Sequence, residues 1–158
     1  MAIEEELAEL LRKNNLTITI AESCTGGLVA GTLVNVPGIS EYFQEGYVTY
    51  SNEAKQKLLG VQAQTLESYG AVSRQTAEEM ALGCARAASA DLGLATTGIA
   101  GPDGGTVQKP VGLVYIGCAF RGTVCVERFV FTGNRRSVRE QAVEQALQLA
   151  KRMLTSQQ

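Results

Sequence analysis

The sequence predicts one α/β domain spanning residues 1–158, in which a mixed β-sheet lies between two layers of helices (a three-layer α/β/α arrangement). The length of 158 residues, 45% of them hydrophobic, is sufficient for one domain with its own core. Segments with helical spacing alternate with short β-rich runs through most of the chain, which is typical of α/β layers. Near the end, two β-rich runs flank Arg121-Gly122 and predict an antiparallel hairpin, so the sheet should be mixed.

The first half of the chain alternates between helical and strand patterns. Ile3 and Leu7 begin a series of apolar residues at helical spacing, and the run LTITIA is rich in β-branched residues. Ser51 or Asn52 is the expected N-cap of a short helix that Gly60 ends. The elements expected here are a helix over 3–13, a strand over 16–21, a helix over 28–36 ended by Pro37-Gly38, a strand over 47–50 and a helix over 52–60.

The second half continues this alternation. Ser73 is the expected N-cap of a long helix, and Asn134 is the expected N-cap of the final one. The glycine-rich segment 98–112 is the longest irregular stretch, and loops of that length in compact domains are usually functional or disordered. The other expected elements are a helix over 64–69, strands over 92–97, 111–120 and 123–131, and a final helix that reaches about residue 154.

Histidine is absent from the chain. Its absence excludes Ser-His-Asp and Cys-His triads, His-ligated metal sites and the usual general base near neutral pH. An enzyme of this composition must use Lys, Tyr, Ser, Thr, Cys or a carboxylate for proton transfer.

The charge balance and the hydropathy pattern narrow the classes of partner. The chain has 14 Lys and Arg against 16 Asp and Glu residues, a net charge of −2, which disfavours a nucleic-acid-binding surface. The first residues lack the apolar stretch of a signal peptide, and no apolar run reaches the length of a membrane span. We therefore expect a cytoplasmic protein without a membrane partner, and apolar helix faces favour a homo-oligomer.

The candidate metal ligands and thiols show no spacing typical of a metal site. No required metal is expected, and no cofactor is assigned, because the carboxylates at Glu22, Glu53, Asp91 and Asp103 are not spaced like ligands. The cysteines form no C-x-x-C pair, and we interpret them as reduced core thiols rather than as a disulfide or zinc site: Cys24, Cys84, Cys118 and Cys125.

The motif AESCTGG follows a predicted strand and precedes a predicted helix. Backbone N–H groups at a helix start, with two glycines that allow close approach, can hold a phosphate or form an oxyanion hole for a hydroxyl nucleophile on the same turn. The alternative is a plain strand–helix connection with Ser23 or Thr25 as N-cap. Cys24 has no histidine to activate it and is interpreted as a buried, inert thiol.

Lys55 lies in the first turn of its predicted helix, where the helix dipole opposes a positive charge. Burial in a pocket would lower the pKa of this lysine and allow it to act as a base. Glu53 or a substrate anion could compensate its charge. The alternative is a solvated surface lysine, which is our interpretation of Lys57.

The glycine loop and the last helix offer candidate anion-binding groups. The loop predicts a backbone cradle for an anion or nucleotide, although it matches neither the dinucleotide nor the P-loop fingerprint. Lys109 could neutralise a phosphate there. Several arginines at a helix start are costly unless an anion lies beside them: Arg135, Arg136 and Arg139. The alternatives are a flexible loop at the sheet edge and solvated arginines.

Taken together, AESCTGG, YSNEAK, TGIAGPDGG and KPVG make the chain resemble the CinA C-terminal domain family over about residues 5–154. The resemblance implies a three-layer α/β/α fold and a metal-free Ser/Lys hydrolase. The implied reaction converts nicotinamide mononucleotide to nicotinic acid mononucleotide and ammonia. On the matched motifs, the resemblance implies Ser23 as nucleophile, Lys55 as general base, and Tyr50 as a residue that assists proton transfer or fixes the dyad.

The resemblance also implies how a small-molecule substrate, a pyridine mononucleotide, is bound. The glycine turns would hold the oxyanion or the phosphate, with one basic residue at the phosphate: Thr25, Gly26, Gly27, Gly101, Gly104 and Gly105, with Lys109, Arg135 or Arg139. Two alternatives of other classes remain. One is a non-catalytic pyridine-nucleotide-binding module, and the other is a regulatory domain for competence or DNA damage, which the charge balance disfavours.

Overall fold

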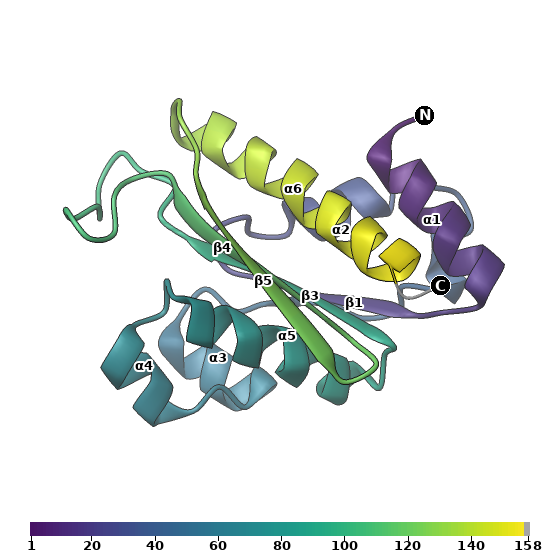
Figure 1. Cartoon of the computed structure of the whole chain (residues 1–158), viewed down its shortest axis with the longest axis horizontal. Helices are drawn as coiled ribbons and strands as arrows, with labels where there is room; N and C mark the ends of the chain where they lie inside the picture. Colours follow the sequence, from purple (N-terminus) through teal and green to yellow (C-terminus); the bar gives the residue numbers. More distant parts are fainter. Residues whose placement is uncertain (157–158) are drawn as a thin grey trace.

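The computed structural model describes residues 1–156, which form a five-stranded sheet between two layers of helices (Figure 1). The strands are β1 (Ile18–Glu22), β2 (Tyr47–Val48), β3 (Leu92–Gly98), β4 (Leu113–Phe120) and β5 (Thr123–Val130). Figure 1 shows one face of the sheet covered by α1 (Ile3–Asn14), α2 (Leu28–Leu33) and α6 (Arg135–Ser156). The opposite face is covered by α3 (Asn52–Leu59), α4 (Ala63–Tyr69) and α5 (Arg74–Ala88), and a 3-10 helix, η1 (Ile39–Glu41), precedes β2. The predicted fold class is confirmed.

The sheet is mixed, with the strand order β2-β1-β3-β4-β5. Strand β1 runs parallel to both of its neighbours, β2 and β3, whereas β4 runs antiparallel to β3 and to β5. The carboxyl ends of β1, β2 and β3 therefore meet at one edge of the sheet. Open α/β sheets commonly bind their ligands outside that edge.

Local sequence signals set the ends of the helices that cover the α3–α5 face. Ser51 Oγ accepts a hydrogen bond from the Ala54 N–H at 3.1 Å, so Ser51, rather than Asn52, is the N-cap of α3. Gly60 ends α3 with a left-handed φ of 71°. Ser73 caps α5 in the same way, as predicted.

Helix α5 packs directly against α3 because a glycine lies at the contact. A Cβ at Gly83 would lie 1.8 Å from the carbonyl oxygen of Leu59, at the end of α3. No other residue type leaves room for this approach. The contact holds α3 under the sheet and with it the first helical turn, which carries Lys55.

Two expected boundaries near β1 are wrong. The strand expected over 16–21 is displaced to Ile18–Glu22. The helix expected over 28–36 ends at Leu33, because Pro37 disfavours helical backbone at the residue before it and the chain leaves the helix through tight turns.

The strand expected over 47–50 is also shorter in the structure. Strand β2 is an edge strand that pairs with β1 only at Tyr47 and Val48. Tyr50 therefore lies in the connection to α3 rather than in the sheet. Among residues 1–156, no helix combines the length and the apolar character needed to cross a membrane.

Candidate active site

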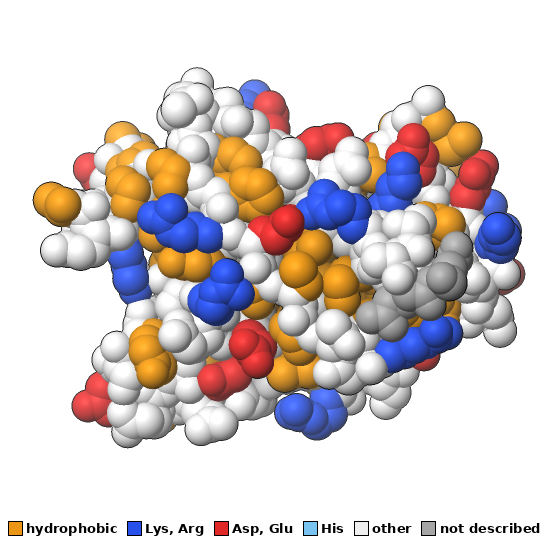
Figure 2. Space-filling model, in the orientation of Figure 1, with side chains coloured by type: hydrophobic (Ala, Val, Ile, Leu, Met, Phe, Trp, Pro, Cys, Tyr) orange, Lys and Arg blue, Asp and Glu red, His pale blue; other side chains and the backbone are white. Residues whose placement is uncertain are grey.

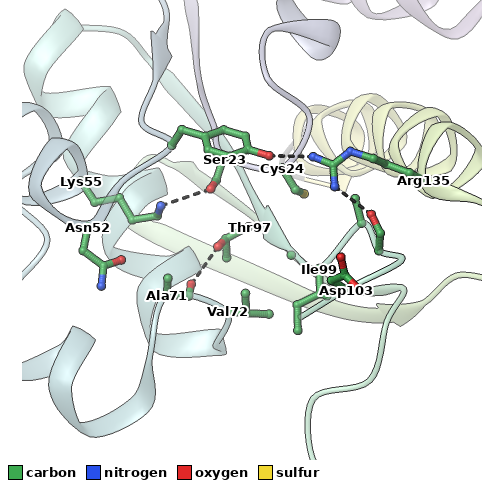
Figure 3. Close-up of a pocket in the computed structure, with 14 residues that line it drawn as sticks. Ser23, Cys24, Asn52, Lys55, Ala71, Val72, Thr97, Ile99, Asp103 and Arg135 are labelled. Atoms are coloured by element: carbon green, nitrogen blue, oxygen red, sulfur yellow. Dashed lines mark hydrogen bonds between the residues drawn. The ribbon is translucent and has the colours of Figure 1, made fainter. Parts of the chain in front are cut away.

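A cavity of about 280 Å³ opens at the carboxyl ends of β1 and β3 (Figure 3). Its wall is built from the turn after β1, the segment that joins β2 to α3, the linker from α4 to α5, the start of the glycine loop and the first residue of α6. Segments far apart in the sequence therefore meet at the sheet edge where α/β proteins bind ligands.

Ser23 and Lys55 face each other in this cavity. Lys55 Nζ donates hydrogen bonds to Ser23 Oγ at 3.1 Å and to the carbonyl oxygen of Thr49 at 2.8 Å. Figure 3 shows the amine and the hydroxyl pointing toward one another. The Ser23 N–H donates to the carbonyl oxygen of Thr96, which ties the backbone of Ser23 to β3. This is the geometry of a hydroxyl nucleophile beside an amine base.

The environment of Lys55 favours its neutral form. The side chain is only 1% exposed, and burial lowers the pKa of Lys55 below its ordinary value. Within residues 1–156 no carboxylate lies within ion-pair distance of its amine. Its place in the first turn of α3 also sets a positive charge against the helix dipole. The alternative of a solvated lysine is thereby excluded for Lys55, whereas Lys57 is exposed.

The two glycines of the turn after β1 are required by its backbone. Gly26 and Gly27 have φ values of 57° and 106°, in the region that other residues rarely adopt. The Gly26 N–H donates to the carbonyl oxygen of Ser23 at 3.0 Å and is therefore not free for a ligand. The N–H groups of Cys24 and Thr25 donate to no acceptor in the described part of the chain, so they are the unpaired donors next to Ser23 in sequence.

The start of α2 is occupied by the protein's own carboxylate. Glu22 is 1% exposed and accepts hydrogen bonds from the N–H groups of Val29 at 2.9 Å and Ala30 at 3.0 Å. The N–H groups at this helix start, which the sequence offered as a site for a phosphate or oxyanion, are therefore already satisfied.

Cys24 lines the cavity but is poorly suited to act as a nucleophile. Its side chain is 5% exposed, and burial raises the pKa of the Cys24 thiol to about 11. The thiol is therefore protonated at neutral pH, as expected for an inert residue.

Arg135 places a positive charge at the cavity (Figure 3). Its Nη1 donates to the carbonyl oxygen of Gly101 at 2.8 Å, and its Nη2 donates to the hydroxyl of Tyr50 at 2.9 Å. Tyr50 lines the same cavity, but among the described residues it has no hydrogen bond to Ser23 or Lys55. Arg135 forms no ion pair with any carboxylate of residues 1–156, so its charge is available to an anionic ligand.

Arg139 binds the turn after β1 and does not line the cavity. Its Nε donates to the carbonyl oxygen of Cys24 at 3.0 Å, and its Nη2 donates to the carbonyl oxygen of Thr25 at 3.1 Å. The guanidinium therefore fixes the turn from the side of α6.

Lys109 and the later loop glycines also lie outside the cavity that holds Ser23. Lys109 Nζ donates to the carbonyl oxygen of Tyr69 at 2.5 Å, at the C-terminal end of α4. Gly104 and Gly105 line a separate hollow on the projecting loop. Of the loop glycines assigned to substrate binding, only Gly101 borders the first cavity.

Sequence reasoning missed several residues that line the cavity. Thr97 donates from Oγ1 to the carbonyl oxygen of Ala71 at 2.8 Å and joins the end of β3 to the α4–α5 linker. Its place at the end of the expected strand over 92–97, directly before the glycine-rich loop, was a usable signal. Asn52 and Asp103 add an amide and a carboxylate to the wall, and the linker residues Ala71 and Val72 carry no comparable signal.

Neither the charged side chains on the face drawn in Figure 2 nor the described thiols form a cluster that indicates a ligand. On the face drawn in Figure 2, Lys and Arg side chains are scattered among acidic and apolar ones. The described residues contain no group of three or more Cys, Asp or Glu side chains placed to hold a metal ion. All four cysteines are free, and three of them are buried.

A family model described as the CinA C-terminal domain matches residues 1–154. A putative competence-damage inducible protein of Clostridium novyi (strain NT) is 54% identical over 154 residues, which cover 98% of this chain and 37% of the relative. A CinA-like protein of Kosmotoga olearia is 53% identical over 153 residues, with coverage of 97% and 37%. The chain therefore spans little more than a third of the length of these curated relatives.

Solved structures agree with the fold over almost the whole chain. A competence-damaged protein (CinA) superfamily protein from Klebsiella pneumoniae superposes with a TM-score of 0.94 at 36% identity, covering 98% of this chain and 96% of that one. A competence/damage inducible protein from Agrobacterium tumefaciens gives a TM-score of 0.88 at 42% identity, with 94% of each chain covered.

Proposed function

Because this chain belongs to the CinA C-terminal domain family, we propose that it hydrolyses the carboxamide of nicotinamide mononucleotide. The products are nicotinic acid mononucleotide and ammonia, so the reaction would recycle pyridine nucleotides. Ser23 is the nucleophile and Lys55 is the general base. The observation that carries the proposal is the buried contact of 3.1 Å between Lys55 Nζ and Ser23 Oγ, made by an amine whose pKa is lowered by burial.

Proton transfer through Lys55 accounts for both halves of the reaction, the formation of the acyl-enzyme on Ser23 and its hydrolysis. Neutral Lys55 accepts the Ser23 Oγ proton as the oxygen attacks the carboxamide carbon. The C–N bond then breaks, and Lys55 gives the proton to the departing nitrogen, which leaves as ammonia. A water molecule next loses a proton to Lys55 and attacks the acyl-enzyme ester. Ser23 departs as the ester bond breaks and recovers its proton from Lys55.

Backbone donors beside Ser23 are suited to the negative charge that develops on the carboxamide oxygen. The N–H groups of Cys24 and Thr25 directly follow the nucleophile and have no acceptor within residues 1–156. Donors fixed before the reaction stabilise an oxyanion without reorganisation. We therefore assign the oxyanion to these two groups and not to Gly26, whose N–H is already paired.

Arg135 is the basic residue that we assign to the substrate phosphate. It alone among the three basic candidates lines the cavity, and its hydrogen-bond partners, Gly101 O and Tyr50 OH, are neutral. A guanidinium binds phosphate through two parallel hydrogen bonds. Binding energy gained at the phosphate would position the distant carboxamide against Ser23.

The test is ammonia release from nicotinamide mononucleotide by the wild-type protein and three variants. Ser23→Ala and Lys55→Ala should each reduce the rate by about 1000-fold or more, with an unchanged circular dichroism spectrum. Lys57→Ala is the matched control, because Lys57 lies exposed on the same helix, and it should retain the wild-type rate.

Two results would contradict the proposal. Near-wild-type turnover by Lys55→Ala would remove the dyad. Tight binding of the nucleotide by the wild-type protein without ammonia release would instead support a non-catalytic binding module.

A further inference from the structure

Glu22 lies immediately before the proposed nucleophile, and the mechanism above gives it no task. It is 1% exposed and holds three hydrogen bonds. Its Oε1 accepts from Thr25 Oγ1 at 2.6 Å and from the Val29 N–H at 2.9 Å, while Oε2 accepts from the Ala30 N–H at 3.0 Å. A buried carboxylate is costly unless it is hydrogen-bonded, so these donors make the position of Glu22 well defined.

The hydroxyl of Thr25 extends this contact to β3. Thr25 Oγ1 lies 2.8 Å from Thr96 Oγ1, and both side chains are fully buried. A hydroxyl has one proton, so when Thr25 donates to Glu22 it must accept from Thr96. The Ser23 N–H donates to the carbonyl oxygen of the same Thr96. The backbone of Ser23 is therefore bonded to Thr96, whose hydroxyl begins a chain of hydrogen bonds that runs through Thr25 to Glu22.

Arg139 holds the same turn through its carbonyl groups. It binds the carbonyl oxygens of Cys24 and Thr25, and Glu22 binds the Thr25 hydroxyl and the helix start that follows. The turn is thus fixed by an anion and a cation that act on different groups. The N–H groups of Cys24 and Thr25 are left without an acceptor among the described residues, next to Ser23.

We propose that Glu22 and Arg139 are positioning residues that hold the turn carrying Ser23 and orient the N–H groups of Cys24 and Thr25 for the oxyanion. The inference rests on the proposed role of Ser23. Its consequence is a loss of turnover without a matching loss of substrate affinity when the hydrogen-bond chain is broken. A displacement of about 1 Å at a reacting group is sufficient to lower a rate by about 100-fold.

Three variants at Glu22 and Thr25, together with a control at Glu79, separate positioning from simple structural support. Glu22→Gln replaces one acceptor oxygen by an amide donor, and Thr25→Val removes the hydroxyl, whereas Thr25→Ser retains it. Each of the first two should lower kcat by about 100-fold with little change in KM. Thr25→Ser should recover most of the wild-type kcat.

Glu79→Gln is the matched control for the loss of a carboxylate. Glu79 also accepts from a backbone N–H (Gln62, 2.9 Å) and from a threonine hydroxyl (Thr65, 2.6 Å), but it is a residue of α5 whose carboxylate binds the start of α4. This variant should lower the melting temperature and leave kcat per folded molecule unchanged. Equal losses of kcat in Glu79→Gln and Glu22→Gln, or an unchanged kcat in both Glu22→Gln and Thr25→Val, would overturn the inference.

Labelling of Ser23 by a fluorophosphonate distinguishes this inference from the proposed substrate. Ser23 Oγ bonds to phosphorus, the P–F bond breaks with release of fluoride, and Lys55 takes the hydroxyl proton. Mass spectrometry of the labelled peptide gives the rate. Slower labelling of Glu22→Gln and Thr25→Val than of the wild type would support the positioning role even if nicotinamide mononucleotide were not hydrolysed. Equal labelling would refute it, and a wild-type Ser23 that neither labels nor hydrolyses would refute both proposals.

Discussion

The thermal stability of the wild-type protein should rise with pH below 10.5, and replacing Lys55 by methionine should abolish this rise. Lys55 is 1% exposed, and burial holds the pKa of its amine below the ordinary value of 10.5. Between the lowered pKa and 10.5, the unfolded chain carries a proton at this side chain that the folded chain lacks. Stability therefore rises with pH across that window. The penalty for burying the amine is complete below the folded pKa and vanishes above 10.5.

The size of the change in melting temperature follows from the one proton that the unfolded chain binds at Lys55 and the folded chain does not. A full difference of one bound proton raises the free energy of unfolding by about 1.4 kcal/mol per pH unit. In a domain of this size, 1 kcal/mol shifts the melting temperature by about 2–4 °C. Relative to Lys55→Met, the wild-type protein should therefore gain about 3–6 °C per pH unit inside the window. Methionine keeps an unbranched apolar chain without a charge to desolvate.

The assay is the difference in melting temperature between the wild type and Lys55→Met, measured by circular dichroism from neutral to alkaline pH. The subtraction cancels other groups that titrate in both proteins. Lys57→Met, which alters an exposed residue of α3, should differ from the wild type by a constant amount. A constant difference for Lys55→Met as well would refute the reasoning, because Lys55 would then have an ordinary pKa in the folded protein.

Four further outcomes can be measured. Arg135→Ala should raise KM for nicotinamide mononucleotide by about tenfold or more with a smaller effect on kcat, because it removes the cation of the cavity. Tyr50→Phe should raise KM to a lesser extent, since it removes only the hydroxyl that accepts from Arg135; a selective fall in kcat would show a proton relay instead. Gly83→Ala should destabilise the protein by about 3 kcal/mol in denaturant unfolding, because its Cβ would lie 1.8 Å from the carbonyl oxygen of Leu59. Ammonia release should also survive EDTA and dialysis, and loss of activity would contradict the metal-free mechanism.

Features that depend on neighbouring residues could be predicted from the sequence. The caps at Ser51 and Ser73 and the stop at Gly60 are local hydrogen-bonding and backbone preferences, and all three are present. The turn after β1 and the first turn of α3 were also recognisable as candidates, because each carries a reactive residue, Ser23 or Lys55, at or just before a helix start.

Features that depend on partners distant in the sequence could not be predicted in this way. Nothing near Glu22 indicates that its carboxylate turns back onto α2, or that Arg139 binds the turn while Arg135 lies at the cavity. The two arginines are four positions apart on one helix, and only the packing of α6 on the sheet decides which of them reaches the cavity and which reaches the turn. The early end of β2, which leaves Tyr50 outside the sheet, likewise reflects its place at the edge.

The hydrogen bonds from Arg139 to the turn that carries Ser23 can form only late in protein synthesis. They join residues 115 and 114 positions apart in the chain. A ribosome makes Ser23 and Lys55 long before it makes α6. The nascent chain therefore contains both side chains before Arg139, which holds the turn, has been synthesised. Under the positioning inference, hydrolytic competence arises in one late step, when α6 docks beside α1 and α2. A chain interrupted before α6 would therefore carry the nucleophile without being able to use it.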